Sequence, residues 1–329
     1  MLAPSNARGL TLLVCCNLLL LCPAVVAQDG RSGGGGIHKD VFDIEREQRQ
    51  QRQGTPQYVV VDLPEKKLRQ YYPELKGLVP AQSQQDLPAL LEKVGASQGH
   101  FVDSIPNVCA TEDVVQENLD KHGWVQGAPV YSERFNYLFR THAKGQGMSL
   151  TEGRANDHWQ MVNPHAPSGY SLAGEFVLFP LNFHPFHQGN ANFRYLGRQV
   201  VGKQEDYVVA FAQQPEKSQL LGAINVNGNE IVVAFQGIAW IDPDTSQIVR
   251  MRIDYLKARP EVGTQSIDTN FSEVRLPMVA QSFWMPRDVV VTRSVGEGSL
   301  RETHKFSDYK IFTKSEDQTA TQSGAEKPK

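Results

Sequence analysis

In the second half of this chain, apolar and polar residues alternate with a period of two, segment after segment. In the first such segment, Tyr131, Phe135, Tyr137 and Phe139 share one face. A period of two is the signature of a β-strand with one buried face and one wet face. Strands are predicted at 131–140, 193–196, 207–213, 231–241, 249–255, 265–271, 289–293, 300–306 and 309–312. Because short turns rather than helices separate them, they predict an antiparallel meander.

A long helix is predicted before these strands, over residues 86–105. Its apolar residues recur at helical spacing, so that one stripe faces a core. Asp86 stands where an N-cap is expected, and Pro106 ends the helix. Gly95 and Gly99 each weaken a helix by about 1 kcal/mol relative to alanine. We expect them to allow close packing against the sheet.

Two shorter elements are predicted on the N-terminal side of this helix. The β-branched run 58–61 is typical of a strand. Residues 64–75 predict a short helix, ended by Gly77 and Pro80.

Together these elements predict an α+β, mostly β fold. A long antiparallel sheet tends to curl, and its apolar face needs a partner. The helix at 86–105 offers one apolar stripe to that face. We therefore expect a curved antiparallel sheet, half-barrel-like, packed against N-terminal helices around an apolar interior.

The cysteines mark an N-terminal export signal. Three of the four lie in the first 22 residues, within an apolar run that follows Arg8. This pattern predicts a signal peptide over 1–27, cleaved between Ala27 and Gln28, and hence a periplasmic or secreted protein. The alternative is an uncleaved N-terminal anchor. Cys109 would remain as the one cysteine of the mature chain, and we expect it to be a buried thiol.

The other boundaries follow changes in composition. The predicted divisions are a flexible linker and polar helix at 28–56, a helical region at 57–129, the β half-barrel at 130–313 and a disordered tail at 314–329. The formal charge is −3 and the calculated pI is about 6.3, which argues against broad, charge-driven binding of nucleic acid.

Three signatures in the strand-rich half resemble the outer-membrane lipoprotein carrier superfamily. They are the hairpin at 193–209, the Trp-Ile-Asp turn with the Arg-bearing strand after it at 237–251, and the Trp-x-Pro approach to a strand at 283–287. The chain is also similar to uncharacterised secreted bacterial proteins. The carrier resemblance implies a half-barrel that binds acyl chains, or a related periplasmic carrier or sensor module.

The function expected from these observations is non-enzymatic binding of an apolar or lipid ligand. A structural or protein-interaction module of the cell envelope with a self-filled core is one alternative, and a metal-dependent hydrolase is another. The expected partners are a lipid or acyl chain, or an envelope protein. Nucleic acid is not an expected partner. Contact with a membrane is expected only during export or at the membrane periphery. The sequence assigns no catalytic residue and leaves the ligand-binding residues unknown.

The hydrolase alternative depends on one unusual pair, His184 and His187. Histidines three apart can chelate Zn²⁺ when a third ligand joins them. His158, His165 and Glu175 are the candidates for that ligand. The sequence has no HExxH motif to support a zinc enzyme. The other interpretation is a loop or strand lip whose imidazoles form hydrogen bonds. No cofactor is then expected, and only the metal-site alternative implies Zn²⁺ or Cu²⁺.

Two charged groups in the strand-rich half are interpreted as structural. Asp242 and Asp244 bracket a proline, which favours a solvated turn over a carboxylate dyad or a calcium loop. Arg250 and Arg252 share a wet strand face with Asp254, where surface pairing explains them.

Overall fold

The computed structural model describes residues 18–20 and 58–312, apart from 145–146, 163–173, 227–228, 258–261 and 296–297. Its helices, with short 3-10 helices written η, are η1 (Val60–Asp62), α2 (Glu65–Tyr71), η2 (Pro73–Leu75), α3 (Leu87–Ser104), η3 (Phe179–Phe183) and α4 (Pro185–Gln188). Its strands are β1 (Leu18–Leu20), β2 (Val79–Pro80), β3 (Val108–Leu119), β4 (Val125–Lys144), β5 (Gly147–Ala155), β6 (Ala191–Val201), β7 (Gln204–Gln213), β8 (Gly222–Val226), β9 (Asn229–Val233), β10 (Phe235–Ile241), β11 (Ile248–Tyr255), β12 (Thr264–Arg275), β13 (Ser282–Val295) and β14 (Gly298–Ile311).

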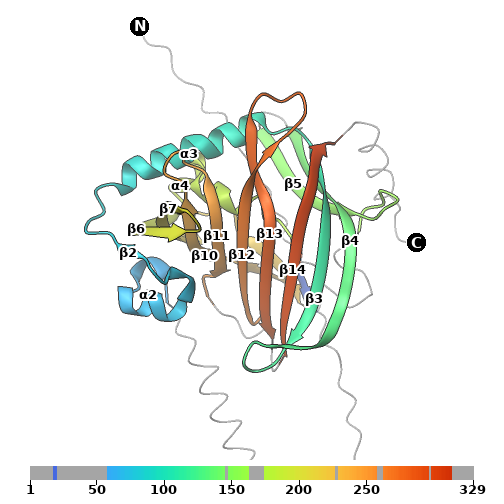
Figure 1. The fold of residues 1–329 in the computed structure, drawn as a ribbon, viewed down its shortest axis with the longest axis horizontal. Helices are drawn as coiled ribbons and strands as arrows, with labels where there is room; N and C mark the ends of the chain where they lie inside the picture. The colour runs from blue at the N-terminus through green and yellow to red at the C-terminus, as the bar shows by residue number, and fades with distance from the viewer. Residues whose placement is uncertain are drawn as a thin grey trace, which may run out of the picture.

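A single curved sheet of 11 strands dominates the molecule (Figure 1). The strand order is β2-β6-β7-β10-β11-β12-β13-β14-β3-β4-β5, and neighbouring strands are antiparallel. Within the described ranges β2 and β5, at the two ends of this order, do not pair with each other, so the sheet is unclosed. The predicted α+β, mostly β fold with a half-barrel-like sheet is confirmed.

A second, small sheet consists of β1, β8 and β9. β8 and β9 are antiparallel, and β1 lies parallel to β8 with Leu18 opposite Ile224. β1 belongs to the segment assigned above to a signal peptide. The predicted cleavage position, the linker and polar helix at 28–56 and the tail at 314–329 lie outside the described residues, so those assignments stay predictions.

The inner face of the large sheet packs on α3, which crosses one end of the strands in Figure 1. The predicted helix at 86–105 is confirmed, although the Asp86 side chain makes no capping hydrogen bond. Phe101 of α3 contacts Phe139 and Phe283 on the sheet, with ring centroids 6.0 and 6.1 Å apart. The apolar stripe therefore covers the sheet as predicted.

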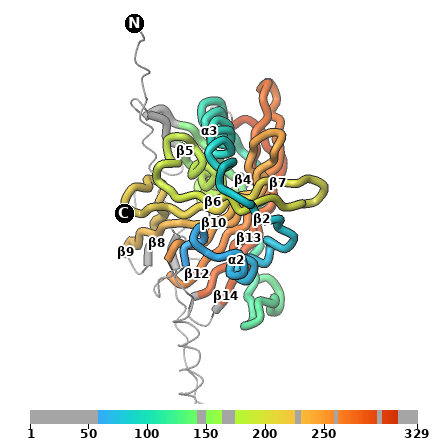
Figure 2. Tube along the Cα trace, turned by 90° about the vertical axis from the view of Figure 1, so that its left-hand side faces the viewer, coloured from blue at the N-terminus to red at the C-terminus, as the bar shows by residue number. Residues whose placement is uncertain are grey.

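A short stretch of chain between β5 and β6 also packs on the inner face. Figure 2 shows the fold turned by 90° from Figure 1. We call residues 174–183, which end with η3, the interior segment. Phe176, Leu181 and Phe183 within it are fully buried, with 0% of their surface exposed. The concave side of the described sheet is thus filled in part by the chain itself.

The outer face of the sheet is covered over β6, β7 and β10 by η1, α2 and η2. This covering corrects the expected wet face of β11. Arg252 lies 2.9 Å from Glu74 of η2 and sits over the Tyr72 ring, and its side chain is only 23% exposed. Arg250 lies over the Trp240 ring and bonds to Asp268 at 2.9 Å. These arginines hold the N-terminal elements and neighbouring strands together rather than pairing in open solvent.

The predicted strand at 58–61 is wrong. Val60 begins η1, and its backbone N–H donates to Oε1 of Gln236 at 2.7 Å instead of to a neighbouring strand. Its apolar side chain is fully buried against the outer face, so the β-branched run serves packing rather than strand pairing. The predicted helix at 64–75 is present in two pieces, because Pro73 has no N–H to continue α2.

The strands begin earlier than predicted. β3 and the start of β4 lie within residues 57–129, which we described as a helical region. Inward-facing positions of β3 hold Glu112 and Gln116 as well as Val108 and Val114. Because polar side chains occupy some of the buried positions, the residues of β3 do not alternate between apolar and polar. The strand is therefore not recognised from its hydrophobicity pattern.

Of the two glycines of α3, only Gly95 allows close packing, and it does so against the region around α4 rather than against the sheet as expected. A Cβ atom on Gly95 would lie 2.6 Å from Nε2 of Gln188, which donates to Leu91 O and Phe183 O. A Cβ atom on Gly99 would meet nothing closer than 3.9 Å.

These two glycines give a matched pair of variants. Gly95→Ala should lower the free energy of unfolding by about 1–2 kcal/mol, because the cost of overpacking exceeds the gain in helix propensity. Gly99→Ala should raise it by about 0.5–1 kcal/mol, since only the propensity term remains. Chemical denaturation of both variants tests this, and shifts of the same sign would contradict the packing described.

Candidate functional site

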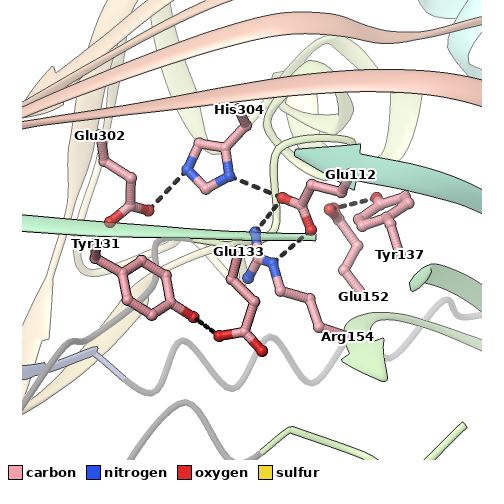
Figure 3. A network of polar contacts seen from close by, with 8 residues as sticks. All are labelled: Glu112, Tyr131, Glu133, Tyr137, Glu152, Arg154, Glu302 and His304. Carbon is pink, nitrogen blue, oxygen red and sulfur yellow. Dashed lines mark hydrogen bonds and ion pairs between the residues drawn. The ribbon is translucent and has the colours of Figure 1, made fainter. Parts of the chain in front are cut away.

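A strip of polar side chains crosses the apolar inner face on β3, β4, β5 and β14 (Figure 3). These side chains come from alternate, inward-facing positions of their strands. Glu152 is partly buried, and the buried members are Glu112, Gln116, Tyr137, Arg154, Glu302 and His304. We call this set the polar strip.

The centre of the polar strip is a chain of ion pairs. Arg154 donates from Nε and Nη2 to the two carboxylate oxygens of Glu112, each at 2.6 Å. His304 lies between two acids, with Nδ1 2.7 Å from Glu112 and Nε2 2.7 Å from Glu302. Gln116 donates to the other oxygen of Glu302. Charges at this depth are tolerated because each has a counter-charge and hydrogen bonds.

This pairing sets the protonation states. Burial alone would raise the pKa values of both Glu112 and Glu302. Arg154 and His304 instead lower the pKa of Glu112. His304 and Arg293 lower the pKa of Glu302. The pKa of Glu302 falls to about 2. Burial would lower the pKa of His304, but its two acidic partners raise it above the ordinary value. The imidazole is therefore positively charged near neutral pH. In this part of the polar strip His304 and Arg154 carry positive charges, and Glu112 and Glu302 are ionised.

Glu152 differs from the other acids of the strip. Its Oε2 accepts the Tyr137 hydroxyl at 2.6 Å, and its Oε1 accepts the backbone N–H groups of Val177 and Leu178 at 2.8 and 3.2 Å. Burial, with a further contribution from Glu175, raises the pKa of Glu152 to about 8. This carboxyl is therefore mostly protonated at pH 7, in the interior, and in contact with the interior segment.

The strip reaches solvent on β4. Tyr131 donates to Glu133, and both lie on the inward-facing row that also holds Tyr137. Glu133 is exposed and Tyr131 half-buried. The inner face thus combines an apolar area with a polar strip that begins at the surface and ends in the core, which is the chemistry that an amphiphilic molecule would meet.

The predicted His184–His187 pair lies at α4, with ring centroids 5.9 Å apart. His184 is the N-cap, and its Nδ1 accepts the backbone N–H of Phe186 at 3.2 Å. A neutral imidazole that accepts at Nδ1 carries its proton on Nε2, so metal binding would have to break this arrangement. His187 is buried, and burial together with His184 lowers its pKa to about 4.

The candidate third ligands do not join this pair in the described chain. His158 is exposed beside Asp157, at 78% of its side-chain surface. Glu175 raises the pKa of Glu152 in the interior, and His165 lies outside the described residues. Among described residues, no group of three His, Cys, Asp or Glu is placed to hold a metal ion. The zinc site stays a prediction, and the contacts seen at His184 are those of a helix cap.

His187 itself yields a test of this structural interpretation. Both of its ring nitrogens are buried, and neither has a hydrogen-bond partner among the described residues. Since an unpaired buried polar group costs about 1–3 kcal/mol, His187→Phe should leave the melting temperature unchanged or raise it. A melting temperature several degrees lower, measured by calorimetry, would show that the imidazole makes an interaction that phenylalanine cannot replace.

Two other predictions concern Asp242 and Cys109. Asp242 accepts the backbone N–H groups of Asp244 and Thr245 at 2.8 and 2.9 Å, so the predicted turn is present, although Asp242 itself is buried rather than solvated. Cys109 is buried, with 1% of its surface exposed. The polar strip, by contrast, was not predicted, although Glu302 and His304 share a face with Phe306 in a predicted strand.

Comparison with known proteins yields similar solved structures but no sequence match. No family model matches the chain, and no curated protein matches it. Within the described residues, no helix is long and apolar enough to cross a membrane.

Three similar structures share about a tenth of their residues with this chain. A DUF1329 family protein from Desulfovibrio piger is 9% identical over 69% of this chain and 93% of its own, with a TM-score of 0.38. A domain assigned to outer membrane lipoprotein sorting, from Vibrio parahaemolyticus, is 10% identical over 70% and 98%, with a TM-score of 0.37. A LolA superfamily protein from Nitrosomonas europaea is 10% identical over 71% and 94%, with a TM-score of 0.31. The resemblance inferred from the hairpin signatures is confirmed as a likeness of fold alone.

Proposed function

We propose that this protein is a non-enzymatic binding protein for an apolar or lipid ligand, acting outside the cytoplasm, with the inner face of the large sheet as its binding surface. One observation carries the proposal. The aromatic inner face of an unclosed sheet is covered by α3, the short interior segment and the small sheet, which adds Ile224 of β8 and Val233 of β9 to the same core. The ligand class agrees with the lipoprotein-sorting assignment of one similar structure.

The contacts of the interior segment identify the surface that such a ligand would use. Phe179 packs on Phe235 with ring centroids 5.2 Å apart, and Phe183 packs on Phe193 and Phe211 at 5.1 and 5.8 Å. These are apolar contacts without directional hydrogen bonds between the rings. An acyl chain can replace them at little cost, because it buries the same apolar surface.

The polar strip supports an amphiphile over a plain hydrocarbon. It lies on the same inner face as the aromatic rings, and Tyr131 and Glu133 bring it to the surface. We expect the polar group of such a ligand to lie on the part of the inner face that holds Tyr131 and Glu133. Polar groups that lose water need such partners.

A structural or protein-interaction module of the envelope is the second candidate. The complete burial of Phe176, Leu181 and Phe183 favours it, because the described interior is already packed by the chain itself. The two candidates differ in whether the interior segment gives way to a ligand.

Removing one ring of the interior segment separates these candidates. We expect the native chain to take up a fluorescent fatty acid, and Phe179→Ala to bind it several-fold more tightly, because the variant frees the surface of Phe235. Tyr71→Ala is the matched control, since Tyr71 stacks on Tyr58 on the outer face. Its affinity should equal that of the native chain.

The contrary outcome is equally clear. If neither the native chain nor Phe179→Ala binds the fatty acid, and native mass spectrometry finds no amphiphile on protein purified from its own envelope, the structural module is favoured. Equal gains in Phe179→Ala and Tyr71→Ala would also contradict binding on the inner face.

A further inference from the structure

The hairpin that joins β3 to β4 projects from one end of the large sheet (Figure 1 and Figure 2). The last pair between β14 and β3 joins Ser299 to Leu119, and residues 120–124 continue beyond it before β4 begins. Residues 121–129 are all exposed. We call residues 120–130 the hairpin tip. The proposed inner-face binding surface does not include it.

The hairpin tip presents apolar side chains to solvent. Those exposed are Trp124, Val125, Ala128 and Pro129. Trp124 is 74% exposed, which is unusual for the largest apolar side chain. The sequence from residue 121 to residue 132 contains Lys121 and His122 but no Asp or Glu. An exposed tryptophan with a neighbouring cation is typical of segments that lie at the interface between water and a bilayer.

A fixed turn holds Trp124 in this exposed position. Oδ1 of Asp120 accepts the backbone N–H groups of His122 and Trp124 at 2.8 and 2.9 Å. The N–H of Asp120 donates to the carbonyl of Trp124 at 2.8 Å, and the N–H of Gly123 donates to the carbonyl of Asp120 at 2.9 Å. Gly123 has a φ of +82°, which glycine adopts readily. Because these bonds already order the turn, docking would lose little conformational entropy.

We propose that the hairpin tip docks on a lipid bilayer, with the Trp124 ring at the level of the head groups. A bilayer suits this surface better than a folded protein does. The neighbours of Trp124 along the turn are all exposed, so they form no packed rim that would exclude water from a protein contact. A bilayer needs no complementary shape, since its interface accommodates both the apolar ring and the polar indole N–H.

The charges at the hairpin tip make the apolar side chains the main source of binding. Asp120 and Lys121 are adjacent and offset each other, and Glu117 is paired with Arg301 at 2.7 Å. We therefore expect docking on a zwitterionic bilayer, with little dependence on salt. This distinguishes it from adsorption by charge alone.

The hairpin tip lies next to the surface end of the polar strip. Tyr131 directly follows the tip on β4, where it pairs with Gln116, and Glu133 lies two residues further along. A bilayer in contact with Trp124 would therefore lie beside the part of the inner face where we expect the polar group of an amphiphile. This delivery role rests on the proposed function. The docking itself requires no ligand.

Binding to phosphatidylcholine vesicles tests the docking. The native chain should bind, and its tryptophan emission should shift to shorter wavelength. Trp124→Ala should lower the partition coefficient about tenfold and remove the shift, because most of the buried apolar surface is lost. Trp124→Phe should restore part of the binding. A native chain that does not bind, or a Trp124→Ala variant that binds as the native chain does, overturns the proposal.

Met278→Ala is the matched control. Met278 is 98% exposed in the turn between β12 and β13, at the end of the sheet opposite to the hairpin tip. This variant should bind vesicles as the native chain does. Since neither Met278 nor Trp124 is part of the core, both alanine variants should keep the native melting temperature. Equal losses of vesicle binding in the two variants overturn the proposal.

Uptake of a fluorescent fatty acid separates docking from ligand binding. Trp124→Ala should take up the fatty acid several-fold more slowly than the native chain from vesicles, but at the same rate from aqueous solution. Equal rates from vesicles overturn the delivery role. A native chain that docks through Trp124 yet takes up no fatty acid from either source supports the docking and contradicts the proposed function.

Discussion

Replacing Arg154 with methionine should lower the free energy of unfolding by about 3–5 kcal/mol. Arg154 makes two hydrogen bonds of 2.6 Å to Glu112, and the side chains are only 9% and 0% exposed. Methionine keeps much of the volume but removes the charge. Glu112 would then be left in the core with His304 as its ionic partner. Chemical denaturation at pH 7 measures the loss.

A surface pair between β3 and β4 provides the control for this variant. Arg134 lies 2.7 Å from Asp113 of β3, with side chains 71% and 45% exposed. Arg134→Met should therefore leave the free energy of unfolding almost unchanged. Adding Glu112→Gln to Arg154→Met should restore part of the stability, because it removes the uncompensated charge. Equal losses in the two arginine variants would contradict the role given to the polar strip.

The native chain should be most stable on the acidic side of neutrality, between about pH 4.5 and 6.5. Glu302 has a pKa lowered to about 2, so its stabilising effect is present above its ordinary pKa and lost as the pH falls toward 2. This loss amounts to about 3 kcal/mol. His304 has a raised pKa, so its contribution is present below 6.5 and lost as the pH rises through the folded value. Glu152, with its pKa near 8, also lowers stability as the pH rises above 4.5.

Melting temperatures measured from pH 3 to pH 9 test this expected stability maximum. Glu302→Gln should flatten its acid side, because the variant no longer gains a proton on unfolding there. Glu152→Gln should flatten the alkaline side in the same way. A melting temperature that rises steadily from pH 4 to pH 9 in the native chain would show that these buried groups do not govern stability.

The sequence predicts the strand-rich half well because its strands have one apolar row and one polar row. β11, for example, alternates from Ile248 to Tyr255 as the printed sequence suggests. The long helix α3 is equally visible, since its apolar residues recur at helical spacing. In both cases the pattern is enough to locate the element, although it does not show that the charged row of β11 is covered by η2.

The candidate site is missed for the opposite reason. Glu112 and Gln116 occupy buried positions that a hydrophobicity pattern assigns to apolar residues, and this also hides β3. Their partners Arg154, Glu302 and His304 lie at least 42 residues from Glu112 in the chain. Only the strand order brings them together. Conversely, His184 and His187 form a visible motif whose described contacts are local and structural.

The pairing of β14 with β3 has a kinetic consequence. Gln116 and Glu302, which meet across this pair, are 186 residues apart in the sequence. Without β14, the β3-β4-β5 meander and the β6–β13 meander each have an open edge and no partner. Joining them requires closure of a very long loop. The entropy lost in this closure opposes pairing until the new contacts between the strands have formed. We therefore expect this seam to form late in folding, with unpaired edges open to association with other chains until it does.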